Sequence, residues 1–172
     1  MSKKERTQHP TESSGLHGFY RVNIVEQDGS VSGDSGWHHN LITTDGLSGY
    51  ITQLFLSAAG SSYVNSLHLG SLQSGLASDA SSLPGEFAKS MMRSVATQST
   101  VRAASNAGDT ARYLATFASN VLSNPSTIAC AGLYATSGAN SIFCGGSFAS
   151  STVGSTQAVN CSYDVVFLAS TS

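Results

Sequence analysis

Residues 160–168 read NCSYDVVFL, and together with AGLYA at 131–135 and CGGSF at 144–148 they decide the fold of this chain. Each stretch is short, largely apolar and typical of a strand, and Gly, Ser, Asn or Thr residues separate it from the next. Asp164 is the only Asp, Glu, Lys, Arg or His that follows Arg112. The last third of the chain therefore predicts packed strands with almost no group that could move a proton.

The same pattern of short strands and turn residues extends back towards the N-terminus. Apolar and polar residues alternate in residues 19–26, and an Asp-Gly turn at 28–29 precedes a return strand. The sequence predicts a mainly β domain, a β-sandwich or jelly roll of about eight strands. The expected strands are residues 19–26, 31–37, 63–70, 91–102, 111–119, 127–135, 141–149 and 158–169.

One segment has the period of a helix instead. Apolar residues recur at spacings of three and four, which predicts one inserted amphipathic helix that packs its apolar face on a sheet. Thr44 or Asp45 is expected to cap its start, and it should end near Gly60. The residues of the apolar face are Leu47, Tyr50, Ile51, Leu54 and Phe55.

Length and composition define the organisation of the chain. The 172 residues suffice for one domain, and we expect a flexible polar arm over residues 1–15 and a single β-sandwich domain over residues 16–172. Residues 1–14 do not resemble a secretory signal, and no apolar run is long enough to cross a bilayer. Synthesis and assembly in a cytoplasm is the simplest expectation.

Charge is unusually scarce. Charged residues make up 10% of the chain, whereas an ordinary globular protein has about 25%. A surface this neutral predicts that neighbouring subunits cover much of it, although a Ser/Thr-coated extracellular domain would have a similar composition. The net charge of -2 gives no field that would hold nucleic acid.

Two motifs suggest chemistry, and neither is convincing. Residues 33–36 read GDSG, as around the nucleophile of trypsin-like proteases, but that family places its catalytic His and Asp far ahead of the Ser. We interpret the motif as a turn. The pair His38-His39 could ligate a metal, but adjacent residues of a strand point to opposite faces.

The remaining residue patterns also predict no catalytic residue, no metal and no cofactor. The acids are too few and scattered for a glycosidase pair, and no glycine-rich loop carries the Lys of a phosphate cradle. Cys130, Cys144 and Cys161 have neither zinc nor redox spacing, which predicts buried thiols. The formal glycosylation sequon at 160–162 is interpreted as chance.

Read in order, several short motifs resemble those of small β-sandwich structural proteins of tailed bacteriophages. They are NLITTDGL at 40–47, LHLG at 67–70 with the loop to LPGE at 83–86, YLATF at 113–117, IACAGLY at 128–134 and GGSFA at 145–149. The loop reads LGSL at 69–72 where LGxG is usual, and Cys130 and Ala131 stand where an acid usually precedes GLF. The position on head, neck or tail therefore stays open.

This resemblance implies a non-enzymatic virion protein, a capsid decoration or cement protein made and assembled in the host cytoplasm. Its expected partners are the major capsid protein or other virion proteins. It would form a homo-oligomer, for which capsid symmetry allows a trimer. The composition predicts no membrane binding, and for the arm it favours contact with neighbouring subunits over contact with nucleic acid. The arm and the loop at 70–86 are expected to order on contact, with partner-contact candidates Lys3, Lys4, Arg6, Leu72, Leu76, Leu83 and Pro84.

Three alternatives remain open at this stage. The chain could be the shell-forming capsid protein itself, built as a single jelly roll. It could be a tail or neck protein. It could also be a glycan-binding receptor module that uses exposed aromatic residues, for which Trp37, Tyr50 and Tyr63 are the candidates.

Overall fold

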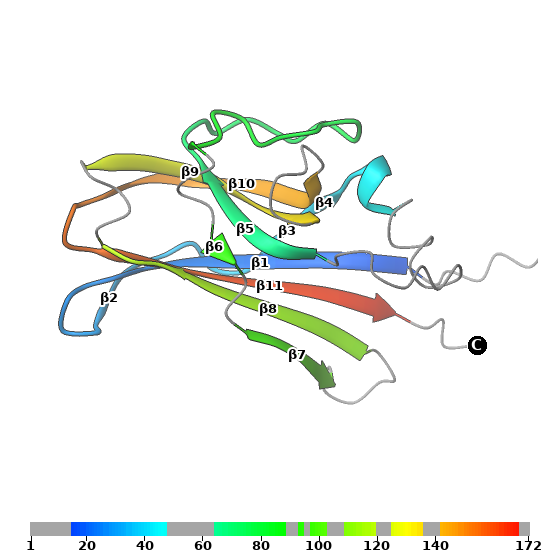
Figure 1. Ribbon diagram of the computed structural model, residues 1–172, viewed down its shortest axis with the longest axis horizontal. Helices are drawn as coiled ribbons and strands as arrows, with labels where there is room; N and C mark the ends of the chain where they lie inside the picture. Colours follow the sequence, from blue (N-terminus) through cyan, green and yellow to red (C-terminus); the bar gives the residue numbers. More distant parts are fainter. Residues whose placement is uncertain are drawn as a thin grey trace, which may run out of the picture.

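Two antiparallel sheets lie face to face in this protein, as the computed structural model shows (Figure 1). The structure describes residues 15–47, 64–88, 93–94, 97–102, 109–119, 125–135 and 142–168. The chain is mainly β, and the predicted β-sandwich is confirmed. In the part of the chain that is described, no helix has the length and apolar character needed to span a membrane.

The first sheet carries the N- and C-terminal strands at its centre. Its order is β2-β1-β11-β8-β7, and β3 also pairs with β1. β1 and β11 are paired over their whole lengths, from Gly15 opposite Leu168 to Val25 opposite Ala158. The strands are β1 (Gly15–Val25), β2 (Val31–Asp34), β3 (His38–His39), β7 (Thr97–Arg102), β8 (Asp109–Phe117) and β11 (Ala158–Leu168).

The second sheet has the order β4-β10-β9-β5-β6. Its central part includes β9 and β10, the two strands of this sheet that the sequence indicated most clearly. The strands are β4 (Leu41–Ile42), β5 (Val64–Gly70), β6 (Arg93–Ser94), β9 (Ser126–Ala135) and β10 (Ile142–Val153). In Figure 1 β9 and β10 form the upper layer, above β1, β11 and β8.

The chain passes from one sheet to the other in two places that the sequence did not predict, between β3 and β4 and between β6 and β7. β3 pairs with β1, and β4, two residues later, pairs with β10, so the chain crosses the edge of the sandwich at Asn40. Its backbone N–H donates to the carbonyl of Gly18, 3.0 Å away. The expected strand over residues 91–102 is likewise divided between β6 in the second sheet and β7 in the first.

The predicted helix begins one residue earlier than expected. Residues 44–47 are helical, and the Oγ1 atom of Thr43 accepts a hydrogen bond of 3.0 Å from the N–H of Gly46. Thr43 is therefore the N-cap, rather than Thr44 or Asp45. Its hydroxyl also donates to the carbonyl of Ile142, which fixes the start of the helix to β10. The rest of the predicted helix lies outside the described residues.

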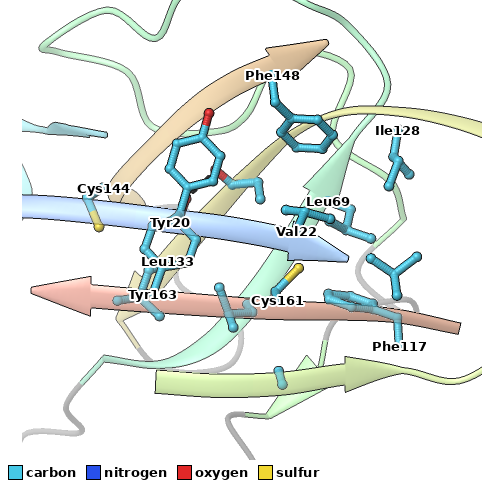
Figure 2. Close-up of a cluster of buried hydrophobic side chains, with 14 of the residues drawn as sticks. Tyr20, Val22, Leu69, Phe117, Ile128, Leu133, Cys144, Phe148, Cys161 and Tyr163 are labelled. Atoms are coloured by element: carbon cyan, nitrogen blue, oxygen red, sulfur yellow. Dashed lines mark hydrogen bonds between the residues drawn. The ribbon is translucent and has the colours of Figure 1, made fainter. Parts of the chain in front are cut away.

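The core is the layer of side chains between the two sheets (Figure 2). In β1 and β11 every second residue points inward, as the period-two pattern predicted. Tyr20 and Tyr163 are opposite each other in the register, are fully buried and stack with ring centroids 5.4 Å apart. Their hydroxyls donate to the carbonyls of Ser147 (2.6 Å) and Ala131 (2.5 Å) in the opposite sheet, so each buried oxygen is satisfied.

A glycine in β10 makes room for this tyrosine layer. A Cβ atom at Gly146 would lie 2.6 Å from the Cε1 atom of Tyr20, which is closer than carbon atoms can approach. The Gly-Gly pair of the sequence motif thus has a packing role here: a larger residue at 146 would displace a fully buried aromatic ring.

Candidate interaction surfaces

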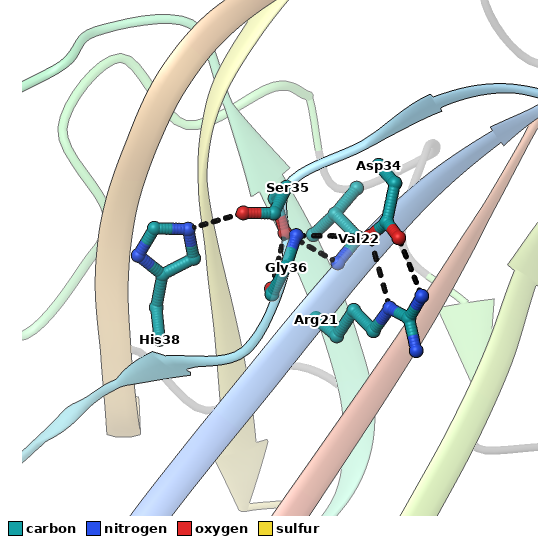
Figure 3. Close-up of polar contacts among 6 residues, drawn as sticks. All are labelled: Arg21, Val22, Asp34, Ser35, Gly36 and His38. Atoms are coloured by element: carbon teal, nitrogen blue, oxygen red, sulfur yellow. Dashed lines mark hydrogen bonds and ion pairs between the residues drawn. The ribbon is translucent and has the colours of Figure 1, made fainter.

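The GDSG motif is a turn that is held against β1 (Figure 3). The hydroxyl of Ser35 donates to the carbonyl of Gly36, 2.8 Å away, and accepts from the backbone N–H of Val22, 2.9 Å away. The carboxylate of Asp34 forms an ion pair with Arg21 and accepts from the N–H of Gly36. The hydrogen bond from Arg21 holds the pKa of Asp34 at about 2. These contacts hold the end of β2 and the turn that follows it against β1.

His38 contacts the backbone of Ser35 and not its hydroxyl. Its Nε2 atom lies 2.7 Å from the Ser35 carbonyl oxygen, which can only accept, so Nε2 carries the proton in this contact. A serine nucleophile needs a histidine nitrogen that accepts from its own Oγ. The observed geometry instead stabilises the turn.

The two adjacent histidines point to opposite faces of the sheet, as the sequence indicated. The ring of His38 stacks on Tyr20 at 5.6 Å, towards the core, whereas that of His39 lies 4.4 Å from Phe19 on the outer face. Among the described residues, no three His, Cys, Asp or Glu side chains are grouped so that they could share a metal ion. Cys130, Cys144 and Cys161 are free and buried.

The loop over residues 71–88 covers the outer face of the second sheet and is the green segment above β9 and β10 in Figure 1. The side chain of Leu83 inserts into a hollow left by glycines, because a Cβ atom at Gly132 would lie 3.0 Å from its Cδ2 atom. Leu83 forms a small second core with Cys130, Tyr134 and Ile142. The loop is therefore packed against its own sheet.

Glu86 ties the end of this loop to the sheet. Its Oε1 atom is 2.6 Å from the Nδ1 atom of His68, and its Oε2 atom accepts a hydrogen bond of 2.7 Å from the hydroxyl of Tyr134. The rings of His68 and Tyr134 stack at 3.8 Å. Burial would raise the pKa of Glu86, but the hydrogen bonds from His68 and Tyr134 outweigh it and lower that pKa below its usual value.

These contacts correct the expectation that the loop orders only when a partner binds. Residues 71–88 are ordered by bonds within a single chain. Of the contact candidates, Leu83 is 4% exposed and Leu76 packs against the same small core, so both serve the fold. Pro84 is half-buried. Leu72 is 57% exposed and stays a contact candidate, while Lys3, Lys4 and Arg6 lie outside the described residues.

A further group of polar contacts lies on the outer face of the first sheet. The guanidinium of Arg112 on β8 forms two hydrogen bonds with the carboxylate of Asp164 on β11, of 2.7 and 2.6 Å. Trp37, which precedes β3, is 46% exposed, and the Cζ atom of Arg112 lies 6.0 Å from the centroid of its ring. Tyr50 and Tyr63, the other aromatic candidates, lie outside the described residues.

Sequence reasoning missed the cluster at Glu86 and the pair at Asp164. Glu86 is 18 residues from His68 and 48 from Tyr134, and no local spacing connects them. Asp164 did carry a signal, because it is the only acid or base in the last third of the chain. An isolated acid in a strand-forming segment indicates a cation nearby in space, and Arg112 is that cation.

The comparisons with known proteins add no relative. No family model matches the chain, no curated protein is similar to it, and no solved structure matches it.

Proposed function

We propose that this chain is a non-enzymatic structural protein of a bacteriophage virion, which decorates the capsid and cements it through contacts between subunits. The observation that carries the proposal is that several of the few charged side chains form ion pairs with one another within the chain. Arg21 pairs with Asp34, Arg112 with Asp164, and His68 contacts Glu86. These contacts use three of the acids among the described residues, and because charged residues are only 10% of the chain the surface carries few charges, which fits coverage by other subunits.

The surface also displays apolar side chains that could be buried in such contacts. Val31 is 58% exposed, Leu72 57%, Leu47 45% and Leu41 40%. Single exposed apolar residues are normal on any protein; here they occur on a chain with few charges. The partners are the major capsid protein or other virion proteins, and copies of this chain form a homo-oligomer. The order of the phage-like motifs supports the virion assignment.

The mechanism is burial of surface and not chemistry. Stable subunit contacts bury about 1,200–2,000 Å² in total. A rigid sandwich whose loop is already folded loses little conformational entropy when it binds. The loop over 71–88 is held by Glu86 and Leu83 before any partner arrives. We expect the loop to contact a neighbouring subunit through Leu72, which is exposed.

The test is binding of the purified full chain to phage particles that lack it. Native mass spectrometry gives the oligomeric state, and co-sedimentation with electron microscopy gives occupancy and position on the particle. We expect a homo-oligomer that saturates the particle surface, with weaker binding by Leu72→Ser than by the matched control Gly75→Ala, a neighbouring loop position with open space. A chain that stays monomeric and leaves the particles bare would contradict the proposal. Closed shells formed from this chain alone would favour the capsid-protein alternative.

A further inference from the structure

The outer face of the first sheet combines an exposed indole with a planar ion pair. β1 and β11 lie between β3, next to Trp37, and β8, which carries Arg112. The 6.0 Å between the Arg112 guanidinium and the Trp37 ring therefore means that both side chains reach across this face towards each other. Nearly half of the Trp37 surface stays open to solvent in that position.

The pairing of β11 with β8 places further polar side chains on the same face. Directly opposite residues of paired strands point to the same side, and so do residues two apart in one strand. Asp164 is opposite Arg112, and Asn160, on the same strand and face, is opposite Thr116. The Thr116 hydroxyl donates to the Asn160 amide oxygen, 2.7 Å away. The face thus presents guanidinium and carboxylate groups near the exposed Trp37 ring, and an amide and a hydroxyl group further along β11 and β8.

The ion pairs on this face favour a neutral ligand over an anionic one. Among the described side chains of this face, Arg21 is paired with Asp34 and Arg112 with Asp164, so each of these two arginines is compensated and offers an anionic ligand no excess positive charge. Arg112 uses two N–H groups on Asp164. A guanidinium has five, and this side chain is 36% exposed, so it can donate further to a neutral acceptor such as a hydroxyl oxygen.

We propose that this face binds a neutral saccharide, with the Trp37 ring stacked on a sugar ring and the Arg112–Asp164 pair hydrogen-bonded to its hydroxyl groups. A pyranose ring offers an apolar C–H face that matches an aromatic plane, and adjacent hydroxyls match the planar donors and acceptors of Arg and Asp. This site is independent of the virion assignment, because particle binding and sugar binding can each be present without the other.

Trp37 is the only tryptophan in the chain, so its fluorescence reports on this site alone. The full chain is applied to an array of neutral and acidic glycans, and each retained glycan is then titrated while emission and acrylamide quenching are recorded. We expect at least one neutral glycan to be retained, with a saturable change in Trp37 emission and reduced quenching.

Variants assign the binding to these residues, with affinities measured by calorimetry. We expect Trp37→Ala to weaken binding at least tenfold and Arg112→Lys about tenfold, because Lys keeps the charge but loses the planar fork. Trp37→Phe keeps an aromatic plane and should retain most of the affinity, even if the alanine variant folds poorly. Gly75→Ala, on the loop over the other sheet and with open space around the new Cβ atom, should bind as the parent does.

Three results would overturn the site. One is an array in which no neutral glycan is retained. The second is retention of acidic glycans alone, which would mean that the paired arginines act as cations. The third is unchanged affinity in a Trp37→Ala protein whose circular dichroism and melting temperature match those of the parent.

Discussion

Arg112 and Asp164, which are 52 residues apart in sequence, meet through two hydrogen bonds on the outer face of the first sheet. Asp164 is 9% exposed, although it stands on the face of the sheet that is turned away from the core. An acid buried to this degree requires a partner, since burying an unpaired charge is costly. The pair thus joins β8 to β11 at the centre of an otherwise weakly charged segment.

We expect Asp164→Asn to destabilise the fold by about 1–2 kcal/mol, because it removes a charge-assisted contact while Arg112 stays partly exposed and can be hydrated. Urea unfolding followed by circular dichroism measures the change. Asp79→Asn makes the same change in charge at an exposed loop position and should leave the unfolding midpoint in place. Equal stabilities of the two variants would show that the pair adds nothing to the fold.

Gly146→Ala should destabilise the core by about 1–3 kcal/mol through overpacking. The new Cβ atom would lie 2.6 Å from a ring carbon of Tyr20, and that ring is fully buried and cannot move aside freely. Gly75→Ala is the control, since no heavy atom lies within 4 Å of a Cβ there. Thermal melting of both variants gives the comparison, and a Gly146→Ala protein that melts with the parent would refute this account of the Gly-Gly motif.

The strands were predictable because each lies with one face on a core, so apolar residues alternate and turn residues mark the ends. What the local pattern could not show is which sheet a strand joins. β3 and β4 are separated only by Asn40, yet they pair in different sheets. The helix cap was misplaced for a similar reason. Thr43 and Thr44 are the same type of capping residue, and the contact of Thr43 with Ile142 on β10, which a local pattern does not show, favours Thr43.

The contacts around Glu86 and Asp164 were beyond sequence reasoning because their partners are brought together by pairing of distant strands. The sequence predicts the leucines of the Ser/Gly-rich loop as partner contacts. Leu83 is instead buried, because Gly132, far along the chain on β9, leaves a hollow of the right size for it. Small residues in a strand can therefore mark the place where a loop will pack.

The three thiols should be unreactive in the folded protein. Burial raises the pKa of Cys130 to about 11 and that of Cys161 to about 12, and it also raises the pKa of Cys144. The thiolate, which is the reactive form, is then scarce at neutral pH and inaccessible. An aromatic disulfide reagent should release little colour from the native protein and three equivalents after denaturation, matching the three cysteines of the chain. Rapid labelling of the native protein would contradict their burial.

The tie formed by Glu86 should make stability depend on pH below neutrality. The pKa of Glu86 is lowered in the folded protein, whereas in the unfolded chain it is about 4.3. Its stabilising contribution is therefore complete above that unfolded value and is lost as the pH falls through the lower, folded value. Glu86→Gln lacks this contribution, and at pH 7 we expect it to be less stable than the parent by about 1–2 kcal/mol.

Urea midpoints of the parent and Glu86→Gln, measured from pH 7 down to pH 3, should therefore converge as the acid is neutralised. Tyr134→Phe provides a matched variant, since it removes one hydrogen bond to the carboxylate and keeps the ring that stacks on His68. That loss should raise the pKa of Glu86 and move the acid transition to higher pH. A gap between parent and Glu86→Gln that stays constant over the whole range would mean that Glu86 holds the loop by packing and not by its charge.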